Sequence, residues 1–279
     1  MSRSSIGKGD LPDLSSDQQQ TTDPMKTMFL LMAVLAATSG IGQEAAQAAF
    51  SAGVAHLKAK EFKDAENSFK TALEVGETEQ GLKMANVYMG FALNGQGKHS
   101  EAITFFTEAI RIDPMDPKTY LDRGAAYARS RKNADAIKDF QYVLTLDSIS
   151  DQAQAAYYWL GRIADAERDH ELAIEYYTKL RQLAPTDFEV YYLRGTAKSN
   201  LMDSEGAIED FDMALKYKPD YMEALANRGV CKINLVPMST KQDKDLDCLD
   251  DPCEDLLKAK AMGDTSVEDM IYLYCKKCK

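Results

Sequence analysis

The feature that most constrains this chain is a glycine that returns at nearly constant intervals through most of its 279 residues. Six such glycines are separated by 37, 34, 37, 34 and 34 residues. Each of the first five is followed by an alanine twelve positions later and by an aromatic residue four positions after that. The pattern comprises Gly53, Ala65 and Phe69; Gly90, Ala102 and Phe106; Gly124, Ala136 and Phe140; Gly161, Ala173 and Tyr177; Gly195, Ala207 and Phe211; and Gly229. A repeat of this length predicts an all-α solenoid, in which stacked helix hairpins bury faces that no single hairpin can bury alone.

The composition of each repeat predicts how its two helices meet. A glycine inside a helix costs up to about 1 kcal/mol relative to alanine, so six equivalent glycines need a packing reason. We expect each to lie on the first helix, where the missing side chain lets the second helix approach the complementary small surface of the alanine. The aromatic residues then fill the gap toward the next repeat. Second helices are expected to end at Pro114, Pro185 and Pro219, because proline has no N–H to continue a helix.

In residue type and spacing, the chain from Ala46 to Ala261 resembles the tetratricopeptide repeat family. The resemblance implies a right-handed superhelical solenoid of about six helix hairpins plus a C-terminal capping helix. The repeats are expected at residues 46–79, 83–116, 117–150, 154–187, 188–221 and 222–261, the last with an insertion at 236–251. The two longer intervals predict extra residues at the repeat junctions near 76–81 and 148–152. A capping helix at 265–277 is predicted by a capping-box pattern, Thr265 with Glu268, ahead of an apolar stripe.

The resemblance also implies a place for a partner, because the first helices of this family line a concave groove that holds peptides. The repeat register places in that groove Phe50, Tyr88, Phe91, Asn94, Lys118, Arg129, Tyr158, Arg162, Tyr192 and Asn200. Tyrosine and arginine tend to dominate interface energetics, and the strip of Lys118, Arg129 and Arg162 favours a peptide that carries carboxylates. The alternative is that the aromatic residues belong to the solenoid core and the charged residues to a solvated face.

Charge and histidine content argue against several other classes of protein. The chain holds 33 Lys and Arg residues against 44 Asp and Glu residues, a net charge of −11, and such a chain repels nucleic-acid phosphates and anionic lipid. Its three histidines lie far apart in the repeats, and it has no glycine-rich phosphate loop or nucleophile elbow. We therefore expect no catalytic residue, no cofactor and no bound metal. The expected partner is a protein or peptide, with no nucleic acid.

The region before the repeats has a different composition. Residues 1–24 are polar and lack apolar periodicity, as in a disordered extension or a misassigned start. Residues 25–42 combine a short basic start, an apolar run and small residues, as in a secretory signal peptide. We expect cleavage after Ser39 or Gly42, and a periplasmic or secreted bacterial protein with no membrane insertion afterwards. The alternatives are an uncleaved anchor helix, or an apolar first helix of a cytoplasmic protein.

All five cysteines stand in the C-terminal part of the chain, at Cys231, Cys248, Cys253, Cys275 and Cys278. Cys253 opens the last predicted second helix, and Cys275 closes the capping helix. Antiparallel neighbours bring the start of one helix beside the end of the next, so we predict a Cys253–Cys275 disulfide. Cys231 with Cys248 is the second candidate pair.

Two metal sites and a redox role compete with this pairing. Four of the cysteines, all except Cys231, have a loose zinc-like spacing, and Cys275 with Cys278 mimics a redox pair without the strand-to-helix setting that tunes such thiols. The acidic insertion follows a calcium-loop spacing at Asp243, Asp245, Asp247 and Glu254. Because Cys248 stands where that loop needs glycine, a solvated acidic loop is the expected reading.

Three functions follow from these observations. The first is a non-enzymatic scaffold that binds a partner in the groove, in the bacterial envelope. The second is a cytosolic assembly or co-chaperone-like adaptor. One kind of chaperone adaptor holds the terminal carboxylate of its peptide with Lys and Asn. The matching positions of this chain are Phe50, Val54, Val87 and Phe91, which argues against that kind of adaptor. The third is a thiol- or metal-dependent accessory protein that uses the cysteine cluster.

Overall fold

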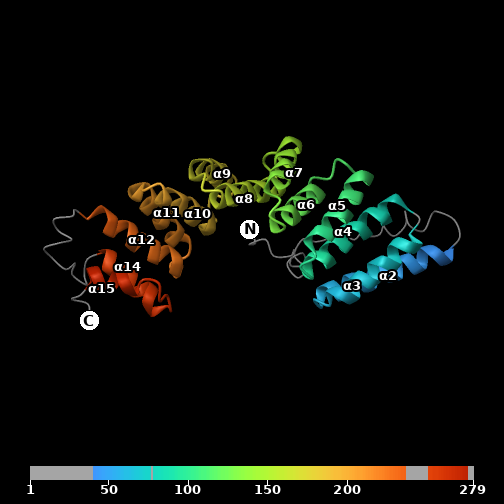
Figure 1. Cartoon of the computed structure of the whole chain (residues 1–279), viewed down its shortest axis with the longest axis horizontal. Coiled ribbons are helices and arrows are strands. Elements are labelled where there is room, and N and C mark those ends of the chain that lie inside the picture. The colour runs from blue at the N-terminus through green and yellow to red at the C-terminus, as the bar shows by residue number, and fades with distance from the viewer. Residues whose placement is uncertain (1–39, 77, 237–250, 276–279) are drawn as a thin grey trace. The chain divides into compact units, whose positions relative to one another are not determined.

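The computed structural model of the chain describes residues 40–76, 78–236 and 251–275, and over these residues it contains thirteen helices and no strand (Figure 1). The all-α prediction is therefore confirmed. The helices are α2 (Gly40–Lys58), α3 (Phe62–Val75), α4 (Glu79–Gly95), α5 (His99–Ile112), α6 (Pro117–Arg129), α7 (Asn133–Leu146), α8 (Asp151–Ala166), α9 (His170–Leu183), α10 (Phe188–Asn200), α11 (Ser204–Tyr217), α12 (Met222–Leu235), α14 (Asp251–Ala261) and α15 (Glu268–Tyr274).

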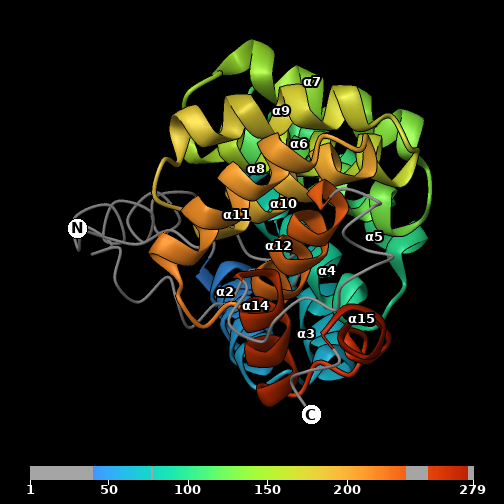
Figure 2. The same cartoon turned by 90° about the vertical axis from the view of Figure 1, so that its left-hand side faces the viewer.

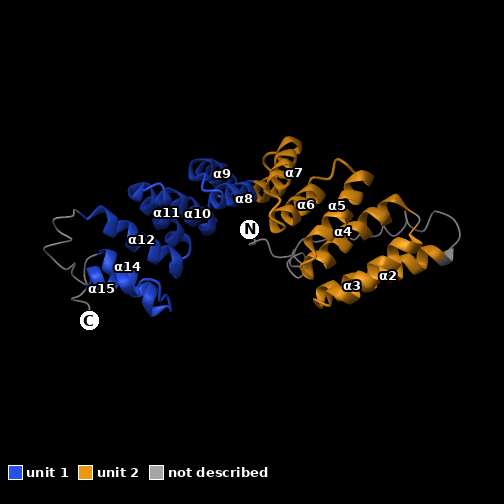
Figure 3. Cartoon of the chain, in the orientation of Figure 1, with its two compact units in different colours: residues 1–6, 157–279 blue, residues 7–156 orange. Residues whose placement is uncertain are grey.

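The described chain forms two compact units that meet in sequence between Ala156 and Tyr157, inside α8 (Figure 3). The N-terminal unit carries α2 to α7, and the C-terminal unit carries α9 to α15. Within each unit, helices that follow one another in sequence pack together. Both views of the chain show α10, α11 and α12 side by side in this order (Figures 1 and 2). Each unit is thus built from consecutive helix hairpins.

The recurring glycines lie on first helices, and an aromatic ring of the second helix covers each of the first five. A Cβ atom added to Gly90 would lie 2.6 Å from the ring of Phe106, and one added to Gly195 would lie 2.9 Å from the ring of Phe211. These rings are completely buried. The ring therefore occupies the space left by the glycine of its own hairpin, a contact that the sequence analysis assigned to the alanines. In the last hairpin, Leu256 takes the place of the ring.

A left-handed residue closes the turn between the two helices of five hairpins. The φ angles are 61° at Lys60, 77° at Gly97, 60° at Arg131, 65° at Arg168 and 63° at Met202. Only glycine adopts this conformation without strain, since a Cβ atom crowds the backbone there. The sequence indicates the turn at Gly97 alone, because the other four positions hold ordinary side chains.

The extra residues of the longer repeats lengthen first helices and do not enlarge the junctions. α4 has 17 residues and α8 has 16, whereas α6 and α10 have 13 each. The Thr78 hydroxyl accepts a hydrogen bond from the backbone N–H of Gly81 at 3.1 Å and so starts α4 early. As expected for the prolines, α5, α9 and α11 each end two residues before Pro114, Pro185 and Pro219.

Two predicted segments, at the start and near the end of the array, fall largely outside the described residues. The predicted signal segment 25–42 lies outside the described residues as far as residue 39, and α2 begins at Gly40. None of the helices in the described ranges is long and apolar enough to cross a membrane. The predicted insertion at 236–251 falls largely on residues 237–250, which are also outside the description.

The helix predicted at 265–277 is shorter, because α15 spans Glu268–Tyr274 and its N-cap residue is Val267. The predicted capping box at Thr265 is wrong. The carboxylate of Asp264 accepts a hydrogen bond from the Ser266 N–H at 2.8 Å, and this forms a turn where the box was expected.

Candidate protein-binding surfaces

A chain of aromatic rings runs across the first helices of the N-terminal unit. Phe50 on α2 contacts Tyr88 on α4 with ring centroids 5.2 Å apart, and Tyr88 contacts Phe91 at 5.6 Å. Phe91 in turn contacts Phe106 of α5 at 5.7 Å. Phe50 and Tyr88 are half-buried, so part of each side chain is available to a partner. We call these two residues the N-terminal aromatic surface.

Two residues predicted for the groove of this unit belong instead to the core. Phe91 is only 6% exposed and is packed between Tyr88 and Phe106, and Asn94 is 8% exposed and hydrogen-bonded to His99 at 3.0 Å. The prediction that Phe91 and Asn94 contact a partner is therefore wrong. Both point toward the second helix of their own hairpin, which the repeat register alone does not reveal.

The predicted positive strip of the N-terminal unit also holds a carboxyl group. Lys118 is exposed in the first turn of α6, and Arg129 is half-buried in its last turn. Asp122 lies between them in sequence, and its Oδ2 atom is buried without a hydrogen-bond partner. Burial raises the pKa of Asp122 to about 7, although Lys118 and Arg129 oppose this shift. This part of the surface is therefore less positive than the basic residues alone predict.

In the C-terminal unit, Arg162 of α8 forms a hydrogen bond with a buried tyrosine. Its Nη1 donates to the Tyr158 hydroxyl at 2.8 Å, and the guanidinium carbon lies 5.7 Å from the Tyr158 ring centroid. Tyr158 is 1% exposed, so the prediction that this tyrosine contacts a partner is wrong. Arg162 itself is exposed, as is Asn200 at the end of α10.

Tyr192 is the half-buried tyrosine of the C-terminal unit that was predicted for the groove, and it lies in a second ring cluster. Its ring centroid is 4.9 Å from that of Tyr221 and 6.1 Å from that of Phe211. Burial raises the pKa of Tyr192, and the nearby carboxylates of Glu223 and Glu189 raise it further. The sequence analysis missed these two glutamates. Their signal was the shared position in the repeat, since each is the second residue of its first helix.

Three largely buried arginines are part of the scaffold and were also missed in the sequence analysis. Arg123, Arg194 and Arg228 each stand directly before a repeat glycine and form paired hydrogen bonds with an aspartate of the second helix. The same guanidinium groups reach back to the preceding hairpin, at Thr107, Thr178 and Asp212. Side chains with this many internal hydrogen bonds hold hairpins together and leave little for a ligand.

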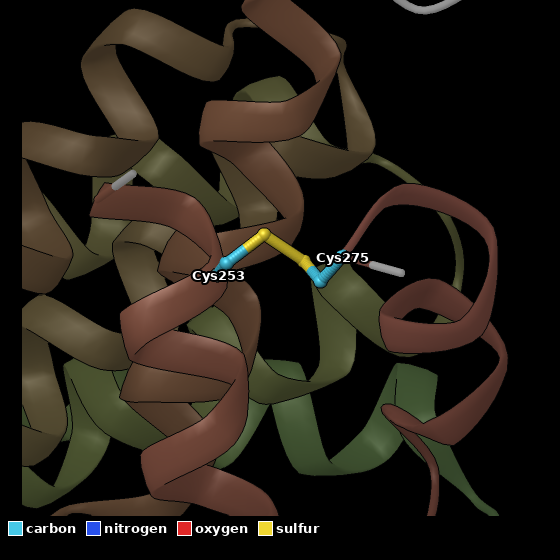
Figure 4. Close-up of a disulfide and its surroundings, with 2 residues drawn as sticks. All are labelled: Cys253 and Cys275. Atoms are coloured by element: carbon cyan, nitrogen blue, oxygen red, sulfur yellow. A yellow bond between two sulfur atoms is a disulfide. The ribbon is translucent and has the colours of Figure 1, made fainter. Parts of the chain in front are cut away.

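The structure joins Cys253 at the start of α14 to Cys275 at the end of α15 by a disulfide (Figure 4). Their Cα atoms are 5.8 Å apart, and both residues are completely buried. Cys231 is a free thiol whose Sγ donates to the Ser199 hydroxyl at 3.3 Å, so the Cys231–Cys248 pairing is wrong. Cys248 and Cys278 lie outside the described residues, as does most of the candidate calcium loop.

Comparison with protein families decides what these hairpins are. Three models of the tetratricopeptide repeat match the chain, over residues 90–130, 121–188 and 188–221. This is a tetratricopeptide repeat protein. The matched region spans both compact units, from α4 through α11.

Several known tetratricopeptide repeat and related proteins are similar to parts of this chain. The mouse RNA polymerase II-associated protein 3 is 33% identical over 98 residues, which are 34% of this chain and 14% of that protein. The Drosophila melanogaster Hsc70-interacting protein 1 is 32% identical over 114 residues, which are 40% of this chain and 29% of that protein. The chain thus spans less than a third of the length of either relative. Among solved structures, PilF of Pseudomonas aeruginosa is 14% identical with a TM-score of 0.64, and the match covers 83% of this chain and 97% of PilF.

Proposed function

We propose that this tetratricopeptide repeat protein is a non-enzymatic scaffold that binds a partner protein or peptide along its first helices. The observation that carries the proposal is the set of half-buried aromatic side chains, Phe50, Tyr88 and Tyr192, each held in place by a neighbouring ring. Rigid aromatic side chains supply large contact area at low entropic cost and are enriched at interface hot spots. Two relatives that match part of this chain are named for their association with RNA polymerase II and for their interaction with Hsc70, and both names describe contact with another protein.

The same proposal assigns the binding groove to the first-helix side of each unit. Lys118, Arg129 and Arg162 remain candidate contacts there, and so does Asn200. Little backbone change is expected on binding, because the rings that support Phe50, Tyr88 and Tyr192 are already packed in the free protein.

We further propose that the protein works outside the cytoplasm, in the periplasm or as a secreted protein, after removal of residues 25–42. The sequence layout of that segment supports the proposal. Removal after Ser39 leaves α2 complete, and removal after Gly42 takes only its first three residues. A cytoplasmic adaptor is the alternative.

Site-specific photocrosslinking tests the binding surface. A benzophenone amino acid replaces Tyr88 or Tyr192, whose ring sites accept an aromatic side chain. Matched controls carry it at Lys70 on α3 and at Lys179 on α9, which are exposed on second helices. We expect one protein to be crosslinked from Tyr88 and Tyr192 and not from the controls. Equal or greater crosslinking from the two control positions would overturn the proposal.

Intact-mass measurement tests the location. The full chain is produced in a Gram-negative host, and its thiols are alkylated before any reduction. A mature chain that begins near Gly40 or Gln43, with at least two thiols unmodified, is the expected result. A chain that keeps its N-terminal segment and carries five alkylated cysteines would favour the cytoplasmic adaptor.

A further inference from the structure

Lys118 and Asp122 lie on the same face of α6, the first helix of the third hairpin. Side chains separated by one helical turn lie one above the other, and the charge of Lys118 acts on Asp122. Lys118 is exposed, whereas the Oδ2 atom of Asp122 is buried. We call these two residues the lysine–carboxyl site.

The buried oxygen of Asp122 has no hydrogen-bond partner within the described residues. A buried carboxylate without donors is costly, and a protonated carboxyl group has an O–H that needs an acceptor. Burial raises the pKa of Asp122 to about 7, with a smaller contribution from Asp116 and against the opposing effects of Lys118 and Arg129. Near neutral pH the group is therefore protonated in about half of the molecules. A ligand with an acceptor oxygen would satisfy that proton.

Other charged groups next to α6 are bound to one another. Asp116, the N-cap residue of α6, binds Lys83 of α4 at 2.8 Å. Asp139 of α7 binds Arg123 of α6 at 2.8 Å. The remaining charged side chains of α5 and α7, other than His99, form pairs on their own helix or are exposed: Glu108 with Arg111, Asp135 with Lys138, and Glu101. These groups are therefore not available to neutralise Asp122.

His99 of α5 also changes its charge at mildly acidic pH, so its state must be separated from that of Asp122. The Nδ1 atom of His99 lies 3.0 Å from the Oδ1 atom of Asn94. Burial lowers the pKa of His99 below its ordinary value of 6.5, and Arg129 lowers it further. His99 is thus neutral over most of the pH range in which Asp122 loses its proton.

We propose that the lysine–carboxyl site binds a glutamate or aspartate side chain of the partner, and that binding takes up one proton from solvent at Asp122. The Lys118 ammonium group attracts the carboxylate of the ligand, and the O–H of protonated Asp122 donates a hydrogen bond to it. The inference rests on the proposed scaffold function. It adds the chemical class of one bound side chain and the pH dependence of its binding.

The direction of the pH dependence follows from the proton. The negative charge of the ligand raises the pKa of Asp122 above its value of about 7 in the free protein. Binding is therefore tightest below that value and weakens as pH rises, because an ionised Asp122 repels the ligand. Between about pH 6 and about pH 8 the affinity should fall about ten-fold, if the bound carboxyl group stays protonated.

Isothermal titration calorimetry of the full chain with two capped peptides tests the proposal. One peptide alternates glutamate with alanine, and the other alternates glutamine with alanine. We expect the glutamate peptide to bind more tightly, and its affinity to fall with pH as stated. Titrations near pH 7.5 in two buffers of different ionisation enthalpy should show proton uptake for the glutamate peptide alone. This last measurement needs no variant of the protein.

Three single substitutions identify the residues responsible. Asp122→Asn supplies an N–H donor at every pH, so it should keep the tight binding seen at about pH 6 and remove both the pH dependence and the proton uptake. Lys118→Gln should weaken binding of the glutamate peptide about three- to ten-fold, the range of one exposed charge pair. Glu101→Gln, at an exposed position of α5, removes one negative charge as Asp122→Asn does and should leave the pH dependence unchanged.

Three results would overturn the inference. An unchanged pH dependence in Asp122→Asn would assign it to another group, such as His99. Equal binding of the two peptides, or no binding of the glutamate peptide, would remove the site and leave the scaffold function intact. Absence of proton uptake by the unsubstituted protein would contradict the role of Asp122. Failure of the scaffold function itself would appear separately, as crosslinking from Lys70 in place of Tyr88.

Discussion

Reduction of the Cys253–Cys275 bond should release the last helix of the array and leave the rest folded. α15 contains no completely buried residue and is held at its two ends by Val267 and Cys275, which are 3% and 0% exposed. The bond closes a loop with a sequence separation of 22, for which the chain-entropy relation gives about 3 kcal/mol of stabilisation.

Amide hydrogen exchange measures this directly. In the oxidised protein the amides of α15 should exchange on the order of a hundred-fold more slowly than in the Cys275→Ser variant or after reduction, which is the rate ratio expected for about 3 kcal/mol. The amides of α10 and α11 should not change. Cys231→Ser is the matched control, because this buried thiol is not part of the bond. Equal exchange of α15 in the oxidised and reduced proteins would refute the reasoning.

Three further predictions concern the repeats. Gly90→Ala should lower the free energy of unfolding by about 1–3 kcal/mol in urea titrations, because the new Cβ atom would lie 2.6 Å from the Phe106 ring, and a more stable variant would contradict this packing. Asp210→Asn should cost about 3 kcal/mol in the same assay, because the buried Asp210 carboxylate is the charge partner of both Arg194 and Lys198, which are largely buried; a loss below about 1 kcal/mol would be too small for the ion pairs described here. The native pKa of Asp122 is about 7 and its ordinary value is 3.8, so the folded protein holds this proton more tightly and stability should fall as pH rises from about 4 to 7. Thermal unfolding across that range should show a shallower decline for Asp122→Asn, and identical slopes would contradict the assigned pKa.

The helix hairpins were predictable because their signals are local and repeated. A glycine such as Gly124 and an aromatic residue such as Phe140 recur at a fixed spacing in the other repeats. A proline such as Pro114 marks the end of a second helix. The family can therefore be assigned from this sequence pattern without any knowledge of side-chain packing. The same locality explains why the number of residues in α4 and α8 was missed, since a longer interval does not say which element absorbs the extra residues.

The surface was less predictable, because a shift of one or two residues along a helix separates a residue that faces a partner from one that faces the core. Phe91 shares its register position with the exposed Arg162, and Tyr158 shares its position with the half-buried Tyr192, yet each is buried by neighbours that only the folded chain supplies. Glu223 was overlooked for the opposite reason, because its effect on the pKa of Tyr192 crosses from one hairpin to the next and is not visible in one repeat.

Hydroxyl-radical footprinting of the full chain, with and without the protein captured by crosslinking, tests the central claim most directly. The account predicts that the partner protects Phe50, Tyr88 and Tyr192 from oxidation. Met115 and Met202, which are 65% and 83% exposed in the turns, should be oxidised equally in both samples. Protection of the two methionines with unchanged oxidation of the three aromatic residues would contradict the claim that the first helices bind the partner.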